Sequence, residues 1–297
     1  MSNAFKHSRW RSVKQHRHFY LFISPFFLLF AVFGLYPILF SLYLSFTRWD
    51  GLTEMTWTGW TNFEVMLQDE LFFTSLWNTF VIGLLYIPPM FAGAFLLATA
   101  LNEGWLRLRG MFRAVFFLPV VTPMVVVSIV FGLLYGQETG LINFVLTSFG
   151  FEPVPWLVSE EWSKPAIAVL LVWRWTGYNM VLMLAGLQGI SPEYYEAARV
   201  EGAGPWRRMR HITLPLMRPV FIFCAITSLI GTVYMFDEVF VLTLGGPGTS
   251  STNFGLYLFN TSFTDFKFGY ASSMAYTVAF FVFIASLVIL LFRREDL

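Results

Sequence analysis

The chain has 297 residues, of which 57% are hydrophobic and only 12% charged, and its mean hydropathy is +0.63. A soluble domain usually carries about 25% charged residues, so this composition excludes an ordinary water-soluble protein. The formal net charge of +1 is informative only through where the charges lie, and we expect no nucleic-acid partner. The single cysteine, Cys224, lies in an apolar run and is expected to be a buried thiol.

Six apolar stretches are long enough to cross a hydrocarbon core about 30 Å thick. They lie near residues 19–46, 72–101, 112–135, 165–187, 219–244 and 269–292. The first is too long for a secretory signal and is not promptly followed by a small-residue cleavage site, so we expect it to be retained. The sequence predicts an all-α integral membrane protein, with a basic arm at 1–18 and a six-helix transmembrane domain at 19–297.

Lysine and arginine are distributed unevenly between the segments that join these spans. The N-terminal arm, residues 102–113, the loop 188–218 and the residues after 292 together hold fifteen, against three in the alternate segments. The remaining one is Arg174, inside the fourth span. The positive-inside rule therefore places both termini and the 188–218 loop in the cytoplasm.

Several spans contain proline, which removes a backbone donor and bends a helix. These prolines are Pro37, Pro88, Pro89, Pro119 and Pro123. The bends either surround a cavity or serve ordinary packing, and the sequence leaves both possibilities open.

The cytoplasmic loop 188–218 carries strong helix signals. Ser191 is an N-cap residue, and Pro192 and Glu193 suit the first turn, so a helix is expected from Pro192 to Val200. Two glycines should then break the chain before a second short, basic helix. Pro215 and Pro219 should mark the return into the membrane.

Within this loop, Glu196-Ala197-Ala198, Gly202-Ala203 and the ending Ile212, Leu214 and Pro215 resemble the EAA loop of ABC importer permeases. The rest of the chain resembles the maltose- and glycerol-3-phosphate-type carbohydrate permeases over nearly its whole length. The supporting pieces are Tyr36-Pro37, Asn78-Thr79, Phe116-Phe117-Leu118-Pro119, Phe236-Asp237, Gly245-Gly246-Pro247-Gly248 and Gly269-Tyr270-Ala271-Ser272. Glu201 and Met209 depart from the usual aspartate and aromatic residue. The resemblance implies a type I ABC importer (MetI-like) permease fold.

The resemblance also implies how the loop works and what the chain assembles with. The loop would dock as a coupling helix on an ATPase through Glu196, Ala197, Ala198, Gly202, Ala203 and Arg207. For Arg207 and its neighbouring arginines, lipid headgroups are an equally good partner. The implied assembly contains a second, distinct permease subunit, two cytoplasmic ATPase subunits and an extracytoplasmic solute-binding protein that docks on 136–164 and 245–268. It would lie in a bacterial or archaeal plasma (inner) membrane, in contact with lipid.

The chain contains no G-x-x-x-x-G-K-[ST] sequence, so it cannot hold ATP phosphates by that route. We therefore expect no cofactor and no catalysis in this chain, with ATP and Mg bound by the partner ATPase. His7, His16 and His18 lie in the N-terminal region and His211 in the loop, so no acid–base cluster indicates a membrane enzyme.

Polar groups inside spans are costly and are candidates for a substrate pathway. Arg174 and Tyr178 share one helical face, as do Ser228, Thr232 and Met235 in the next span. In maltose-type permeases the sugar lies between these two helices. The candidate pathway residues are Arg174, Trp175, Tyr178, Asn179, Ser228, Thr232, Met235 and Asp237.

Arg174 has two competing interpretations. It pairs with a carboxylate or phosphate of an acidic substrate, or it forms an internal ion pair with Asp237 or Glu238. The sequence predicts a permease of an ATP-driven importer for a sugar or oligosaccharide, and it leaves open whether that sugar is neutral or acidic. The alternatives are an importer of a glycerol-phosphate-type anionic solute and, less favoured because no repeat is visible, an ion-coupled secondary transporter.

Overall fold

The computed structural model describes residues 16–103 and 108–291, which form helices along most of their length. Within these described residues, five helices are long and apolar enough to cross a membrane: Arg17–Leu44, Glu70–Asn102, Ser163–Gln188, Pro205–Val233 and Phe268–Leu291. A sixth candidate span is the bent pair formed by α6 (Arg109–Val121) and α7 (Met124–Leu134). These spans confirm the predicted all-α membrane fold. Helices suit lipid because they satisfy their own backbone hydrogen bonds.

The described chain divides into two compact units, and the first comprises residues 16–67 and 261–276. Its elements are α2 (Arg17–Phe30), the π-helical turn η1 (Ala31–Leu35), α3 (Tyr36–Leu44), the paired antiparallel strands β1 (Thr47–Arg48) and β2 (Thr56–Trp57), α4 (Thr61–Leu67), most of η3 (Asn260–Thr264) and the start of α15 (Phe268–Leu291). Asn62 on α4 donates to the carbonyls of Ser45 and Thr47, 2.9 and 2.8 Å away. This amide therefore ties α4 to the end of α3.

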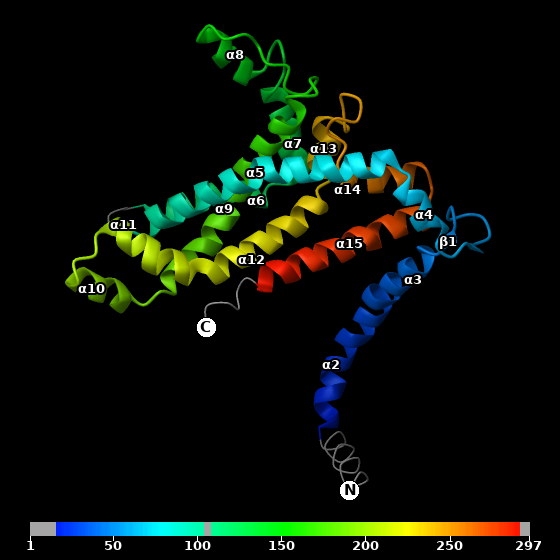
Figure 1. Ribbon diagram of the computed structural model, residues 1–297, viewed down its shortest axis with the longest axis horizontal. Coiled ribbons are helices and arrows are strands. Elements are labelled where there is room, and N and C mark those ends of the chain that lie inside the picture. The colour runs from blue at the N-terminus through cyan, green and yellow to red at the C-terminus, as the bar shows by residue number, and fades with distance from the viewer. Residues whose placement is uncertain (1–15, 104–107, 292–297) are drawn as a thin grey trace. The chain divides into compact units, whose positions relative to one another are not determined.

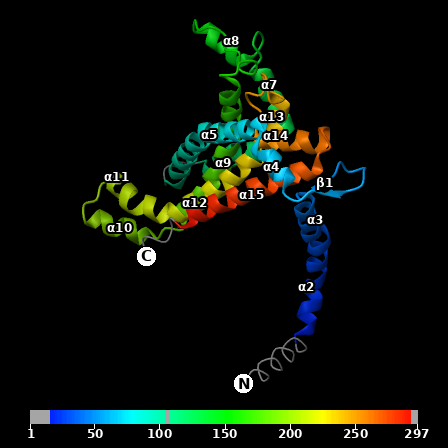
Figure 2. The ribbon, with the colours of Figure 1, turned by 45° about the vertical axis from the view of Figure 1, so that its right-hand side comes forward.

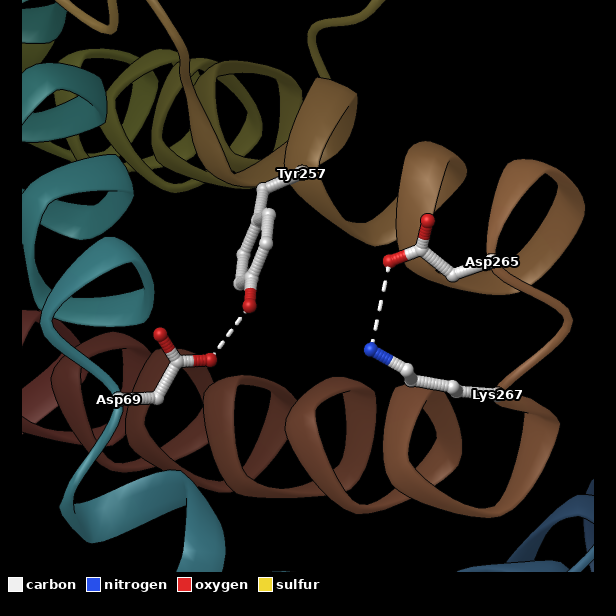
Figure 3. Close-up of polar contacts among 4 residues, drawn as sticks. All are labelled: Asp69, Tyr257, Asp265 and Lys267. Carbon is white, nitrogen blue, oxygen red and sulfur yellow. Dashed lines mark hydrogen bonds and ion pairs between the residues drawn. The ribbon is translucent and has the colours of Figure 1, made fainter.

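The start of α15 packs closely against the end of α3 in this unit. A Cβ on Gly269 would overlap the Thr47 carbonyl oxygen, so only glycine allows this approach. Just before α15, Lys267 and Asp265 form an exposed ion pair of 3.6 Å (Figure 3). An exposed pair of this kind contributes little stability.

The second unit comprises residues 68–260 and the part of α15 from 277 onward. Its elements are α5 (Glu70–Asn102), α6, α7, α8 (Leu141–Ser148), α9 (Ser163–Gln188), α10 (Pro192–Val200), α11 (Pro205–Arg208), the π-helical turn η2 (Met209–Thr213), α12 (Leu214–Val233), α13 (Asp237–Leu242) and α14 (Phe254–Phe259). The long helices α5, α9 and α12 pack against one another (Figures 1 and 2). Fully buried Met90, Met180 and Met217 lie in the two apolar clusters of this bundle.

The first turn of α5 is anchored to α14 by one carboxylate. Asp69 caps α5 by accepting hydrogen bonds from the backbone N–H groups of Leu71 and Phe72, 3.0 and 3.2 Å away. The Tyr257 hydroxyl on α14 donates to the other oxygen of the same carboxylate (Figure 3). The cap therefore also fixes α14 beside the start of a long helix.

The predicted third span, 112–135, is not one continuous helix. It is interrupted between α6 and α7, whose axes differ by 96°. Thr122 has an extended backbone (ψ 134°) and directly precedes Pro123, and a residue before proline is disfavoured in helical geometry. Pro88 and Pro89, in contrast, lie inside α5 without ending it.

The predicted fifth span, 219–244, begins earlier and ends earlier than expected. Helical structure runs from Pro205 to Val233, so Pro215 and Pro219 lie within it and the second basic helix is its first turn. The π-helical turn η2 precedes Pro215, and such a turn rearranges the backbone hydrogen bonds next to a residue that has no donor. The chain then breaks at Tyr234 before the short α13.

Candidate functional site

The break between α6 and α7 is built around Arg174 on α9. Its Nη1 donates to the carbonyls of Pro119 and Thr122, at 2.9 and 2.8 Å, and its Nη2 donates to Val120, at 3.3 Å. Carbonyls at a helix C-terminus have no partner within the helix. A cation there also interacts favourably with the helix dipole. Arg174, only 9% exposed, therefore supplies the hydrogen bonds that this break leaves unmade.

Gly177, three residues further along α9, brings the two helices into backbone contact. A Cβ at this position would overlap the carbonyl oxygen of Phe116 on α6. The glycine has no side chain, so α6 can lie directly on the α9 backbone. Arg174 and Gly177 together position the broken helix on α9.

The internal ion pair proposed for Arg174 can be compared directly with this geometry. In the part of the chain that the structure describes, Arg174 forms no ion pair with Asp237 or Glu238. Its guanidinium lies on α6, with its central carbon 5.5 Å from the Trp175 ring centroid. Tyr178, four residues further along α9, lines the cavity described below, whereas the Arg174 guanidinium is directed to α6.

A cavity of about 80 Å³ lies between α5, α9 and α12, and its wall is completed by the residues that follow α12. Six predicted pathway residues line it: Trp175, Tyr178, Asn179, Ser228, Thr232 and Met235. The other lining residues are Tyr86, Leu171, Thr227, Gly231 and Glu238. Arg174 and the exposed Asp237 do not line it. The predicted faces of the two spans therefore meet, and α5 adds a third wall.

Tyr86 is the residue that sequence reasoning missed on α5. Its hydroxyl lies 2.6 Å from the Thr232 hydroxyl, which itself donates to the carbonyl of Ser228, 2.7 Å away. Tyrosine hydroxyls that are buried usually find a partner. Tyr86 lies in a long apolar span, and no local pattern identifies the helix it faces.

Asn179 presents an unusual amide to the cavity. Its Nδ2 donates to the Trp175 carbonyl at 3.1 Å and contacts the Met90 sulfur at 3.4 Å, whereas its buried Oδ1 has no hydrogen-bond partner. The residue is only 3% exposed. Buried acceptors without partners are rare in folded proteins, and each calls for an explanation.

Two asparagine side chains, Asn253 and Asn78, hold the segment that follows α12 in place. Asn253, which is fully buried, donates to the carbonyl of Met235 and accepts from the backbone N–H of Leu256 at 3.2 Å. Asn78 on α5 donates to the carbonyls of Thr249 and Thr252, at 2.9 and 3.0 Å. The loop that begins with the predicted Gly245–Gly248 breaker is therefore bonded both to α5 and to the cavity wall.

The 188–218 loop has the predicted helix with its predicted ends. Ser191 accepts from the backbone N–H of Glu193 at 3.4 Å, and α10 ends in a Schellman motif. In that motif Gly202 (φ +79°) donates to Arg199, at 3.0 Å, and Ala203 donates to Ala198, at 2.8 Å. A left-handed backbone is costly for any residue with a Cβ, so the motif explains the glycine.

The loop presents a largely exposed surface. Glu196, Ala197, Gly202 and Arg207 are exposed, and Ala198 and Ala203 are half-buried. Large apolar side chains that sequence reasoning had not singled out accompany them: Tyr194, Val200 (90% exposed) and Trp206 (76% exposed). Exposed apolar groups gathered beside charges are typical of a protein-binding surface.

Comparison with known proteins identifies the family of the chain. Residues 91–294 match the family described as "Binding-protein-dependent transport system inner membrane component". The lactose transport system permease protein LacF of Rhizobium radiobacter is 38% identical over 281 residues, covering 93% of this chain and 94% of that protein. The arabinooligosaccharides transport system permease protein AraP of Bacillus subtilis is 34% identical and covers 96% of this chain and 92% of its own length.

Further matches include a more distant relative and a solved structure. The sulfoquinovosyl glycerol transport system permease protein SmoG of Agrobacterium fabrum is 31% identical, with 90% of this chain and 87% of that protein covered. The crystal structure of a bacterial ABC transporter that imports the acidic polysaccharide alginate contains a chain of the same fold. Its TM-score is 0.85 at 23% identity, covering 98% of this chain and 100% of that chain.

Proposed function

The chain belongs to the family of binding-protein-dependent transport system inner membrane components, and we propose that it forms half of a sugar-translocation pathway. It is a permease that carries out no catalysis of its own and acts with a binding protein and other ABC transporter components. Its substrate is a sugar or oligosaccharide. Relatives named for lactose and arabinooligosaccharide transport cover nearly the whole chain and support this substrate class.

The observation that carries the proposal is the cavity between α5, α9 and α12. It combines aromatic rings, Trp175 and Tyr178, with hydroxyl and amide groups from Ser228, Thr232 and Asn179. Aromatic faces pack on sugar C–H surfaces, and polar side chains bond sugar hydroxyls. At about 80 Å³ the cavity is smaller than a disaccharide, so it serves as one wall of a pathway completed by a second permease subunit.

We place both termini and the 188–218 loop in the cytoplasm of a bacterial or archaeal cell, on the charge asymmetry described above. In the complete assembly two ATPase subunits lie beneath this loop. A solute-binding protein docks on the opposite side, at 136–164 and 245–268. Lipid surrounds the exposed apolar faces of the long helices.

The surface of α10 is the proposed ATPase contact. The exposed Glu196 and Ala197, together with Val200 and Trp206, offer charge, a close backbone approach and unpartnered apolar area. Cysteine at Ala197 should crosslink to a cysteine in the cleft of the ATPase subunit. Absence of a crosslink there, while a cysteine elsewhere on the loop reacts, would contradict this orientation.

The function is tested by reconstituting the complete complex in proteoliposomes with its binding protein. Labelled lactose and arabinotriose are the first probes, and uptake should require ATP inside the vesicle. Uptake that follows an imposed ion gradient without ATP would instead support the secondary-transporter alternative. If the vesicles accumulate none of the sugars that the binding protein binds, the proposal is refuted.

A further inference from the structure

The helix α10, at the proposed ATPase contact, shares little packed surface with the rest of the second unit. None of its residues is buried, and only Tyr195 and Ala198 are half-buried. A cavity of about 520 Å³ lies between α10, the ends of α5 and α9, and the first turns of the segment that continues as α12. Figures 1 and 2 show α10 and α11 together at the end of the unit where this segment begins. Apolar packing therefore does not hold α10 on the bundle, and its few polar contacts matter more.

One hydrogen bond joins α10 to the helical segment on the other side of this cavity. The Tyr195 hydroxyl lies 3.0 Å from the Thr213 hydroxyl in η2, and both residues line the cavity. Either hydroxyl can donate to the other. Thr213 is only 5% exposed, so its hydroxyl has little access to water as an alternative partner. Within the described residues, no ion pair and no other side-chain hydrogen bond joins α10 to α5, α9 or η2.

The position of Thr213 connects this hydrogen bond to the transmembrane spans. Thr213 is the last residue of η2, and α12 continues directly from it. Near the far end of α12, the Thr232 hydroxyl lies 2.6 Å from the Tyr86 hydroxyl on α5. The covalent route from α10 to the same helical segment passes through Gly202 and Gly204, and glycine restricts the backbone least. The Tyr195–Thr213 hydrogen bond is therefore the more direct route between α10 and α12.

We infer that the Tyr195–Thr213 hydrogen bond transmits displacement between α10 and α12, which makes both residues positioning residues for the coupling of ATP hydrolysis to transport. The inference rests on the proposed function, in which α10 contacts the ATPase. When the ATPase displaces α10, the bond carries η2 and the start of α12 with it. Coupling between two sites is reciprocal, so docking of the binding protein acts on the ATPase through the same bond. Without it, α10 shifts over the cavity while α12 stays in place.

The test is the ATPase activity of the complete complex in proteoliposomes, with and without binding protein that has been loaded with lactose or arabinotriose. Tyr195→Phe removes only the hydroxyl, and Thr213→Val replaces the other hydroxyl by a methyl group of similar shape. Tyr194→Phe is the matched control, because Tyr194 is the neighbouring tyrosine, is 57% exposed and does not line the cavity. Crosslinking of Ala197→Cys to the ATPase, repeated with each substitution, reports whether α10 still docks.

We expect Tyr195→Phe and Thr213→Val each to lower the ratio of stimulated to unstimulated ATPase activity about fivefold, the factor that one neutral hydrogen bond is worth. The double variant should lose no more than either single variant, because each change already removes the bond. Tyr194→Phe should keep the wild-type ratio. The Ala197→Cys crosslink should form in every variant, since α10 remains folded and in contact with the ATPase.

Three results would overturn the inference. The first is a ratio that Tyr195→Phe leaves unchanged, and the second is a pair of losses that add in the double variant; the proposed function stands in both cases. The third is a crosslink that disappears together with the stimulation, because the bond would then hold α10 on the ATPase rather than join it to α12. If neither sugar stimulates the wild-type complex and ATP drives no uptake, the proposed function fails as well.

Discussion

Arg174→Met separates a structural arginine from a substrate-binding one. Methionine keeps an unbranched side chain like the aliphatic stem of arginine. It has no N–H groups, so the hydrogen bonds to the carbonyls of Pro119, Val120 and Thr122 are lost. Three lost hydrogen bonds at about 1 kcal/mol each give a destabilisation of about 3 kcal/mol. Because all three carbonyls lie at the break between α6 and α7, the loss should loosen this junction rather than alter the cavity lining.

The assay for Arg174→Met is thermal unfolding of the purified complex, followed by uptake of one neutral and one acidic sugar. We expect the unfolding midpoint to fall by about 5–10 °C and uptake of both sugars to fall by the same factor. Arg174→Lys should recover only part of the stability, because one ammonium lacks the planar fork that reaches several carbonyls. Unchanged stability with a selective loss of acidic-sugar uptake would refute the structural role and restore the acidic-substrate interpretation.

Three further substitutions test the geometry elsewhere. Gly177→Ala should destabilise the complex by about 2 kcal/mol, because its Cβ would overlap the α6 backbone, whereas Gly93→Ala meets only ordinary contact and should unfold like the wild type. Gly202→Ala should weaken sugar-stimulated ATPase activity, because a backbone φ of +79° costs a residue with a Cβ about 1 kcal/mol. The control Gly204→Ala, at φ −66°, should leave this activity unchanged. Equal effects of the two substitutions would contradict the argument from the Schellman motif. Asn143→Ala removes three donor contacts and two acceptor contacts in the 136–156 segment, so proteolysis there should accelerate and stimulation by the binding protein should fall. Unchanged protease resistance would show that the segment does not depend on this amide.

Local sequence signals predicted the structure of the 188–218 loop well because that structure is set by short-range chemistry. Ser191, Pro192 and Glu193 specify where α10 begins, and Gly202 specifies where it ends. Each of these residues acts on a backbone group within a few positions of itself. The six apolar stretches were visible for a similar reason, since composition alone reveals a segment that lipid can surround.

The breaks in the spans were harder to predict because proline acts through its surroundings. Pro123 ends a helix where Arg174 from another span supplies hydrogen bonds, whereas Pro215 follows a π-helical turn and leaves its helix continuous. Both are single prolines in apolar sequence. For Pro123 the deciding partner, Arg174, lies far away in sequence. For Pro215 the deciding feature is a local change of helix type that no residue pattern predicts.

The candidate cavity was predicted in part, and the missing residues have physical reasons. Ser228 and Thr232 were found because helical spacing places them on one face. Tyr86 comes from a helix that contributes no polar pattern of its own, and Glu238 enters the cavity only because α12 ends at Val233 and redirects the chain. A continuous fifth span through residue 244 would have carried Glu238 along a different path.

The helical segment that ends at Val233 also connects the cavity with the 188–218 loop. Helical structure runs without interruption from Pro205, in the loop, to Val233, beside the cavity, a length of about 43 Å at 1.5 Å per residue. Thr232 at its far end holds Tyr86, and Asn253 holds the Met235 carbonyl just beyond it. A helix of this kind transmits a displacement of its first turn to its last, because its backbone hydrogen bonds resist shortening. The π-helical turn η2 is a local irregularity in it, which makes Met209–Thr213 the place where such a displacement would be absorbed or redirected.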